Sequence, residues 1–151
     1  MSAAPARGER RGGAVADEFQ AAFWTAKRAM AMAAEAAYNR HGVRAGQQFI
    51  LQCLWETDGL APGEIARRLE LATPTVTRAT TRMEAAGLLR REPHPTDARL
   101  VRLQLTERGR ELETVIADEM TRLSERALRT LSATERDQLI RFLGEIRRNV
   151  S

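Results

Sequence analysis

The chain has one cysteine, Cys53, among its 151 residues, and no run of about 18 consecutive apolar residues. A single cysteine excludes an intramolecular disulfide framework. The lack of a long apolar run argues against a membrane-spanning helix. The N-terminus also lacks the apolar core of a secretory signal peptide. We therefore expect a cytoplasmic protein with no membrane partner.

Local signatures of catalysis and of metal binding are missing as well. The sequence contains no Gly-rich phosphate loop, no nucleophile elbow and no local pairing of His with Cys or with a carboxylate. His41 and His94 are the only histidines, and without further cysteines or clustered carboxylates they make no metal site. We expect neither an enzyme nor a bound metal or cofactor.

Positive charge is concentrated in one part of the chain. Residues 61–106 contain 8 basic and 5 acidic residues, whereas residues 107–151 contain 9 of each. The net charge of the whole chain is +4, so most of the excess lies in residues 61–106. A locally basic segment of this kind is typical of nucleic-acid-binding proteins.

Within that segment, the pattern predicts two short helices joined by a turn. The apolar stripe of the first helix consists of Ile65, Ala66 and Leu69. Thr73 is a plausible N-cap for the second helix, because its hydroxyl can accept from open backbone amides, and Pro74 fits the first turn. Gly87 is suited to end that helix.

The second helix has the composition of a DNA-recognition helix. Its apolar face consists of Val76, Thr80 and Met83. Its other faces carry Thr75, Thr77, Arg78 and Arg82. Arg can bond guanine through two hydrogen bonds, and Thr can contact bases or phosphates. We expect Thr75, Thr77 and Arg78 to reach the major groove, with Thr73 and Arg82 beside them.

After Gly87 the apolar period changes to two, which predicts a two-stranded hairpin over residues 89–105. Val101, Leu103 and Leu105 share one face of the returning strand. Two prolines and an Asp in residues 93–99 favour a projecting loop. Arg99 in this loop is placed to enter a minor groove, and Asp97 can brace its guanidinium group.

Taken together, residues 47–109 resemble the MarR family of bacterial transcriptional regulators. The matching motifs are Glu64-Ile65-Ala66-x-x-Leu69, Pro74-Thr75-Val76-Thr77-Arg78, Met83-Glu84-x-x-Gly87-Leu88, Asp97-x-Arg99, and Val101-x-Leu103-x-Leu105-Thr106-x-x-Gly109. One departure is Glu70, which occupies the turn where a small or flexible residue is common. The resemblance implies a mainly α (α+β) fold, a winged helix-turn-helix with N- and C-terminal helices that form a dimerisation region.

The flanking segments suit that organisation. We expect a disordered arm over residues 1–13 and a single domain over residues 14–151. Within that domain, residues 45–106 form the DNA-binding lobe, and residues 14–44 and 107–151 form the dimerisation helices. Thr106 and Ser132 are the expected caps of two C-terminal helices. The apolar surface of the terminal helices exceeds what a lone winged domain requires, although a monomeric helical cap is an alternative.

These features predict a sequence-specific transcriptional regulator, a homodimeric repressor that an effector releases from a near-palindromic operator in double-stranded DNA. The resemblance implies that the effector is a small aromatic or anionic molecule bound between the dimer helices and the lobe. Trp24, Phe49 and Trp55 are candidate pocket walls, although packing in the core is the commoner role of aromatic residues.

Two alternative functions remain. Cys53 would be the sensor of a redox-responsive regulator, but no Lys or Arg adjoins it in sequence to lower its pKa, which favours a buried structural thiol. The fold would otherwise serve as a winged-helix protein-interaction module that does not read DNA. The basic excess in residues 61–106 argues against the second alternative.

Overall fold

The computed structural model describes the backbone of residues 7–151, with side chains from residue 12 onward. The elements are α1 (Arg7–Arg40), α2 (Gln47–Glu56), α3 (Pro62–Leu69), α4 (Thr73–Ala85), β1 (Leu89–Pro93), β2 (Val101–Leu105), α5 (Glu107–Ala127) and α6 (Ala133–Val150). The fold is mainly helical with one antiparallel hairpin, as the sequence predicted. No helix in this part of the chain is long and apolar enough to cross a membrane.

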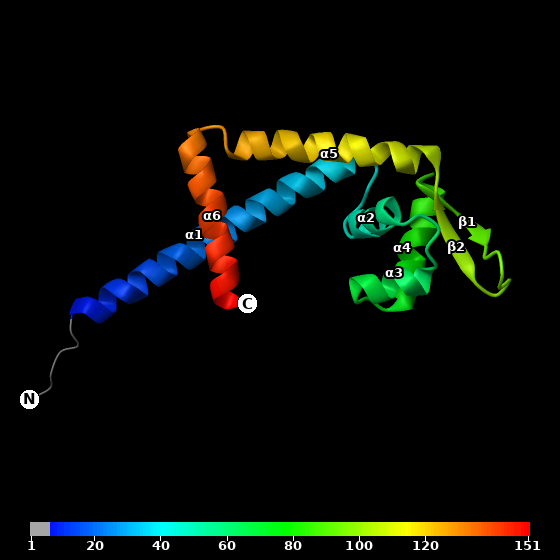
Figure 1. Cartoon of the computed structure of the whole chain (residues 1–151), viewed down its shortest axis with the longest axis horizontal. Coiled ribbons are helices and arrows are strands. Elements are labelled where there is room, and N and C mark those ends of the chain that lie inside the picture. Colours follow the sequence, from blue (N-terminus) through cyan, green and yellow to red (C-terminus); the bar gives the residue numbers. More distant parts are fainter. Residues whose placement is uncertain (1–6) are drawn as a thin grey trace, which may run out of the picture.

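The molecule has two parts (Figure 1). Helices α2, α3 and α4 and the hairpin form a lobe at one end of α5. Helices α1, α5 and α6 form a helical arm, in which the C-terminal end of α1 lies against α5 and α6 descends from the far end of α5. Arg40 and His41 attach the end of α1 to α5 through Glu119, at 2.7 Å from Arg40 Nη2 and 3.0 Å from His41 Nε2.

Helix α1 begins earlier than predicted. It starts at Arg7, so residues 7–13 of the expected disordered arm are helical, and residues 1–6 lie outside the described part of the chain. Gly8, Gly12 and Gly13 disfavour a helix by only about 1 kcal/mol each. Once a long helix is nucleated, each added residue gains a hydrogen bond, so the helix extends through this Arg- and Gly-rich segment.

The predicted N-cap of α4 is also wrong. Thr73 is the first helical residue, and the N-cap is Ala72, which has no side-chain cap. The carbonyl of Ala72 accepts from the amides of Thr75 and Val76, at 3.0 and 3.3 Å. These are the amides that a Thr73 hydroxyl would have capped, so no donor is left for it.

The main core lies in the lobe. Val76, Thr80 and Met83 are fully buried, which confirms the predicted inner face of α4. They pack in a cluster with apolar side chains from every other lobe element, including Ile50, Leu54, Ile65, Leu89 and Leu103. Helix α6 contrasts with this, because none of its residues is buried.

The turn between α3 and α4 contains Glu70 in a left-handed conformation, with φ of 54°. Leu71 N donates to Ala66 O across this turn at 2.9 Å. A residue with a Cβ atom adopts this conformation at a cost of about 1 kcal/mol. The turn therefore has the backbone geometry that a glycine would favour, although the chain places Glu there.

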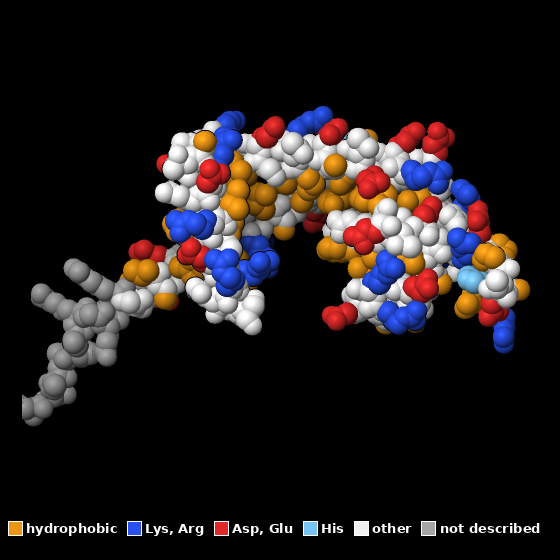
Figure 2. Space-filling model, viewed as in Figure 1, with side chains coloured by type: hydrophobic (Ala, Val, Ile, Leu, Met, Phe, Trp, Pro, Cys, Tyr) orange, Lys and Arg blue, Asp and Glu red, His pale blue; other side chains and the backbone are white. Residues whose placement is uncertain are grey.

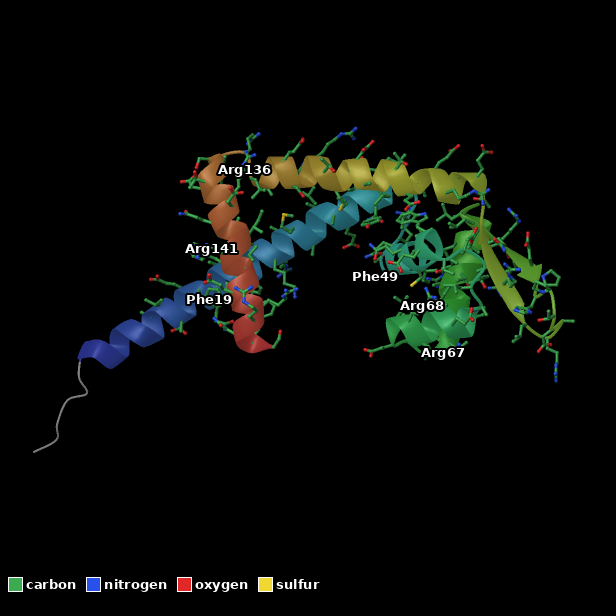
Figure 3. All side chains as sticks on the ribbon, in the orientation of Figure 1. Phe19, Phe49, Arg67, Arg68, Arg136 and Arg141 are labelled. Carbon is green, nitrogen blue, oxygen red and sulfur yellow. The ribbon has the colours of Figure 1, made fainter. Side chains whose placement is uncertain are left out.

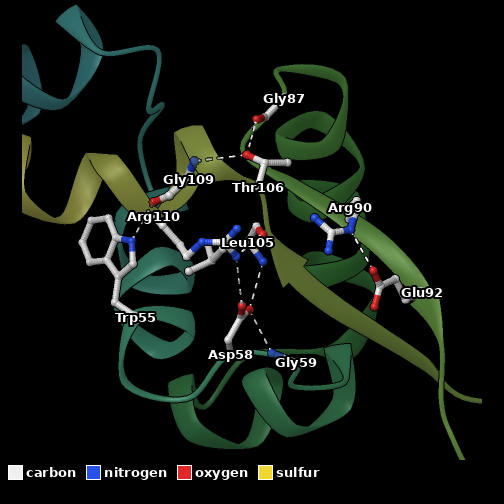
Figure 4. Close-up of polar contacts among 10 residues, drawn as sticks. All are labelled: Trp55, Asp58, Gly59, Gly87, Arg90, Glu92, Leu105, Thr106, Gly109 and Arg110. Carbon is white, nitrogen blue, oxygen red and sulfur yellow. Dashed lines mark hydrogen bonds and ion pairs between the residues drawn. The ribbon is translucent and has the colours of Figure 1, made fainter.

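Hydrogen bonds join α5 to the lobe (Figure 4). Thr106 Oγ1 donates to Gly87 O at 2.6 Å and accepts from Gly109 N at 3.1 Å, which confirms the predicted cap of α5. Trp55 Nε1 donates to Gly109 O at 2.9 Å. Asp58 Oδ2 lies 3.8 Å from Arg110 Nη1. The start of α5 is therefore attached to the lobe by directional contacts.

The predicted cap of α6 is confirmed as well. Ser132 Oγ accepts from Glu135 N at 3.2 Å, and Glu135 Oε2 accepts from Ser132 N at 2.7 Å. This reciprocal pair satisfies two amides that the start of a helix leaves open.

Candidate nucleic-acid interface

Helix α4 presents a polar row on the side away from the core. Thr75, Arg78 and Arg82 are exposed, and their spacing of three and four residues places them along one side of the helix. In the described part of the chain, the Arg78 and Arg82 side chains have no hydrogen bond or ion pair. Two unpaired guanidinium groups on a firmly packed helix are suited to contact bases and phosphates.

Thr77 differs from the other polar residues of α4. Its side chain is half-buried, and Oγ1 donates to Thr73 O at 3.0 Å. On α4, Thr73 and Thr77 lie on the flank that faces the hairpin, where both line a cleft. The structure therefore places this pair beside the exposed row and not within it.

The hairpin projects as the wing of a winged helix. Its strands pair antiparallel, from Leu89 opposite Leu105 to Pro93 opposite Val101. In the loop, the Arg99 side chain is 92% exposed, and its backbone N and Nε lie 3.0 and 3.5 Å from Asp97 Oδ1. The geometry matches the expected brace, in which Asp97 holds the base of an outward-pointing Arg99.

Arg91 fastens the wing to α4. Its Nη2 donates to Thr77 O at 3.2 Å, to Thr80 Oγ1 at 3.2 Å and to Thr81 Oγ1 at 2.8 Å. Its backbone N donates to Glu84 Oε2 at 2.9 Å. These bonds set the separation between the two elements that would enter adjacent grooves. Sequence reasoning missed this role, because the contacts join residues 7 to 14 positions apart in the chain.

A cleft of about 810 Å³ lies between the wing, the segment from the α2–α3 loop to the start of α3, and the flank of α4 that carries Thr73 and Thr77, and we call it the wing cleft. Its basic lining residues are Arg67, Arg91, His94, Arg99 and Arg102. Figure 3 labels Arg67 and its neighbour Arg68 on α3, and of these two only Arg67 is among the residues that line the cleft. Asp58 and Glu64 are the acidic lining residues. The excess of basic groups makes this cleft suitable for a phosphate backbone.

The three candidate effector residues lie on two helices and differ in their surroundings. Trp24 is 54% exposed on α1, and its Nε1 donates to Gln20 Oε1 at 2.6 Å. Phe49 is 51% exposed on α2 (Figure 3). Trp55 packs against the lobe core and bonds to Gly109. Core packing thus accounts for Trp55 but for neither of the other two.

Cys53 lies in the lobe core and is 8% exposed. Burial raises the pKa of its thiol, and the charge of Arg68 opposes this only in part. Because the thiolate is the reactive form, a raised pKa lowers reactivity toward oxidants at neutral pH. The fold therefore favours a structural thiol. The fold also places Arg68 near Cys53, although these two residues are not neighbours in the sequence.

Known proteins share this fold and parts of this sequence. Residues 44–101 match the MarR family. The chain is 36% identical over 100 residues to the HTH-type transcriptional regulator Mb0904 of Mycobacterium bovis, covering 64% of this chain and 68% of that protein. It is 36% identical over 92 residues to the regulator TtmR of Methylorubrum extorquens, but this match spans only about half, 47%, of TtmR.

Solved structures agree in architecture. The disulfide-formed structure of AbfR superposes with a TM-score of 0.79 at 21% identity, covering 94% of this chain and 93% of AbfR. A mutant of S. aureus MepR bound to an oligodeoxyribonucleotide gives a TM-score of 0.71 at 21% identity, covering 88% and 98%. At these identities the likeness shows the winged-helix fold, and the sequence matches show the family. The chain belongs to the MarR family of HTH-type transcriptional regulators.

Proposed function

We propose that the protein is a homodimeric, ligand-responsive repressor that reads a near-palindromic operator. The observation that carries the DNA-binding part is the exposed row on α4, backed by a fully packed inner face and flanked by a braced wing. In this proposal Thr75 and Arg78 contact base edges in the major groove. Arg99 enters the neighbouring minor groove, where a narrow width raises the negative potential.

The remaining polar residues have supporting roles. Arg82 contacts the backbone beside the major groove. Thr73 and Thr77 line the wing cleft, so they contact a phosphate or order water along the same strand. Asp97 acts through Arg99 and does not touch DNA. The MepR mutant has the same fold and was solved bound to an oligodeoxyribonucleotide, which supports this use of the lobe.

The helical arm supports the dimer. Apolar side chains are exposed along α1 and α6, and Figure 2 shows apolar surface under α5 and along the inner side of α6. The larger ones are Val15, Phe19, Trp24, Met30, Met32, Ile140, Phe142, Leu143 and Val150. Apolar surface on this scale is costly for a free monomer, and a two-fold partner would bury it in both copies.

A dimer also connects effector binding to DNA affinity. Two recognition helices must be about 34 Å apart to enter successive major grooves on one side of DNA. The bonds from Gly109 and Thr106 to the lobe make that separation depend on the position of α5. Trp24 and Phe49 remain the proposed contacts for a small aromatic or anionic effector, whose binding would shift α5 and release the operator.

The first test is a pull-down of genomic fragments with the purified protein at two salt concentrations. We expect a few fragments to persist at the higher salt and to share an inverted repeat. Retention of every fragment at low salt and of none at higher salt would indicate electrostatic binding alone, and would contradict a specific regulator. Absence of DNA binding at both concentrations would favour a protein-interaction module.

Base reading is tested separately with Arg78→Ala. The variant should lose affinity for the recovered operator and also discriminate less between that operator and altered sequences, by about 1–3 kcal/mol at the contacted base pair. Affinity loss with unchanged discrimination would assign Arg78 to a phosphate instead.

A further inference from the structure

A second basic cavity lies on the other flank of α4, away from the wing. It has a volume of about 450 Å³, and its lining includes Arg44, Gln47, Ala79, Arg82 and Arg108. We call it the α2 pocket, because the start of α2 contributes to it. Thr77 in the wing cleft and Ala79 in the α2 pocket are two positions apart, which separates them by about 200° around the helix. The two cavities therefore border the exposed row of α4 on opposite sides.

All charged side chains that line the α2 pocket are positive. Three arginines and no acidic residue line it. Arg108 is held in place, since Nη1 donates to Ala86 O at 2.8 Å and Nη2 to His41 O at 3.4 Å. Among the residues that the structure describes, the Arg44 and Arg82 side chains have no such partner. One fixed and two free guanidinium groups thus converge on the same space without a counter-charge.

The side chain of Gln47, the first residue of α2, adds a donor. Gln47 lines the pocket although it is only 6% exposed. Its Oε1 accepts from Arg44 N at 3.0 Å, whereas its Nε2 has no hydrogen-bond partner in the described part of the chain. An amide donor left open on a nearly buried residue, beside arginines, favours an acceptor in the pocket.

We propose that the α2 pocket binds a tetrahedral oxyanion, and that in the DNA complex this oxyanion is a backbone phosphate. A helix of about 10–12 Å diameter fills a major groove about 12 Å wide, so the two phosphate strands pass along its two flanks. The wing cleft faces one strand, and the α2 pocket faces the other. This inference rests on the proposed DNA-binding function, and it adds sequence-independent contacts from Arg44 and Arg108, which lie outside the recognition helix and the wing.

The test variant is Arg44→Gln, because Arg44 has no structural bond through its side chain, whereas Arg108 does. The matched control is Arg129→Gln, an equal charge change at an exposed position beyond the far end of α5. The dissociation constant is measured against salt concentration on an operator fragment and on an unrelated fragment. We expect Arg44→Gln to weaken both complexes about tenfold at low salt and to reduce the salt slope by about one per bound protomer, with operator preference retained. An unchanged slope, equal to that of Arg129→Gln, would overturn the DNA assignment.

A second measurement distinguishes a DNA phosphate from a free anion as the ligand of the α2 pocket. Thermal unfolding is measured in inorganic phosphate and in chloride at equal ionic strength. We expect phosphate to raise the midpoint of wild-type protein and of Arg129→Gln, but not that of Arg44→Gln. A phosphate effect that is lost in Arg44→Gln, together with an unchanged DNA slope, would leave a site for free oxyanions and overturn the DNA contact. If wild-type protein binds no DNA, the proposed function fails. Thermal unfolding in phosphate and in chloride then decides alone whether the oxyanion site exists. No phosphate effect and no slope change would overturn the whole proposal.

Discussion

The lobe and the helical arm differ in how much of their apolar surface is buried within the single chain. The lobe buries its apolar side chains within one chain, so that Ile65, Val76, Met83 and Leu103 are all fully buried. The arm leaves Trp24, Met32 and Leu143 about half exposed or more, and α6 has no buried residue. The lobe therefore has a core of its own, whereas much of the apolar surface of the arm is left uncovered within the single chain. In the proposed dimer, this difference would combine two firmly packed DNA-binding lobes with a contact that forms only between chains.

The largest effect is expected from a substitution that prevents dimerisation through the helical arm. Leu143→Asp puts a charge on the exposed apolar side of α6 in both copies, and burying an unpaired charge is strongly unfavourable. We expect the dimer dissociation constant to rise about 1,000-fold, equivalent to about 4 kcal/mol. Light scattering across a dilution series measures it.

The control is Arg148→Asp, which lies about 180° around α6 from the side that carries Phe142, Leu143 and Val150. It should leave the dimer intact. A Leu143→Asp variant that remains dimeric, or a wild-type protein that is monomeric throughout the series, would contradict the account of the arm.

The same methionine truncation should have unequal effects in the two regions. Met83→Ala opens a cavity in the fully buried lobe core and should lower the free energy of unfolding by about 3 kcal/mol. Met32→Ala, at a position 61% exposed on α1, removes little packing within the single chain, so it should change the free energy of unfolding by less than about 0.5 kcal/mol when measured below the dimer dissociation constant, and should instead weaken the proposed dimer. Urea denaturation of both variants makes the comparison. Equal losses would show that the arm has a core within the monomer.

A substitution in the wing should weaken DNA binding and leave the lobe core and the proposed dimer intact. Arg99→Ala removes the most exposed guanidinium of the wing and should weaken operator binding about tenfold or more, with no change in dimer mass. Arg90→Ala is the control, because Arg90 is already paired with Glu92 at 2.7 Å (Figure 4). Unchanged affinity in Arg99→Ala, or loss of the dimer, would refute the assignment of Arg99 to the minor groove.

The smallest effect is expected where α1 is attached to α5. Hydrogen bonds from His41 and Arg40 hold the pKa of the Glu119 carboxyl below its ordinary value. A lowered pKa in the folded state contributes stability above the ordinary pKa of Glu, and this contribution is lost as pH falls through the folded value. Wild-type protein should therefore be slightly more stable than Glu119→Gln near neutral pH.

Thermal midpoints measured between about pH 7 and pH 3 test this contribution. The difference between wild-type protein and Glu119→Gln should shrink toward zero at the acid end. A difference that grows on acidification has the wrong sign for this linkage and would exclude it.

Sequence reasoning succeeded where one element carries its own signal. The inner face of α4 and the alternation of β2 follow from periodicity, and the caps at Thr106 and Ser132 follow from residue type and spacing. It failed at Thr73, where a backbone carbonyl took the amides that the hydroxyl was expected to cap. It also placed the start of α1 too late, because glycine and arginine content was given more weight than helix propagation.

The sequence by itself determined the MarR resemblance, the order of the helices and the wing, and the location of the basic excess. Each of these depends on residues close together in the chain. Only the tertiary structure decided that Arg91 fastens the wing to α4, that Arg68 lies near Cys53, and that Arg44, Arg82 and Arg108 meet in one pocket. Such contacts depend on how the helices pack, since packing brings together side chains that no local pattern relates.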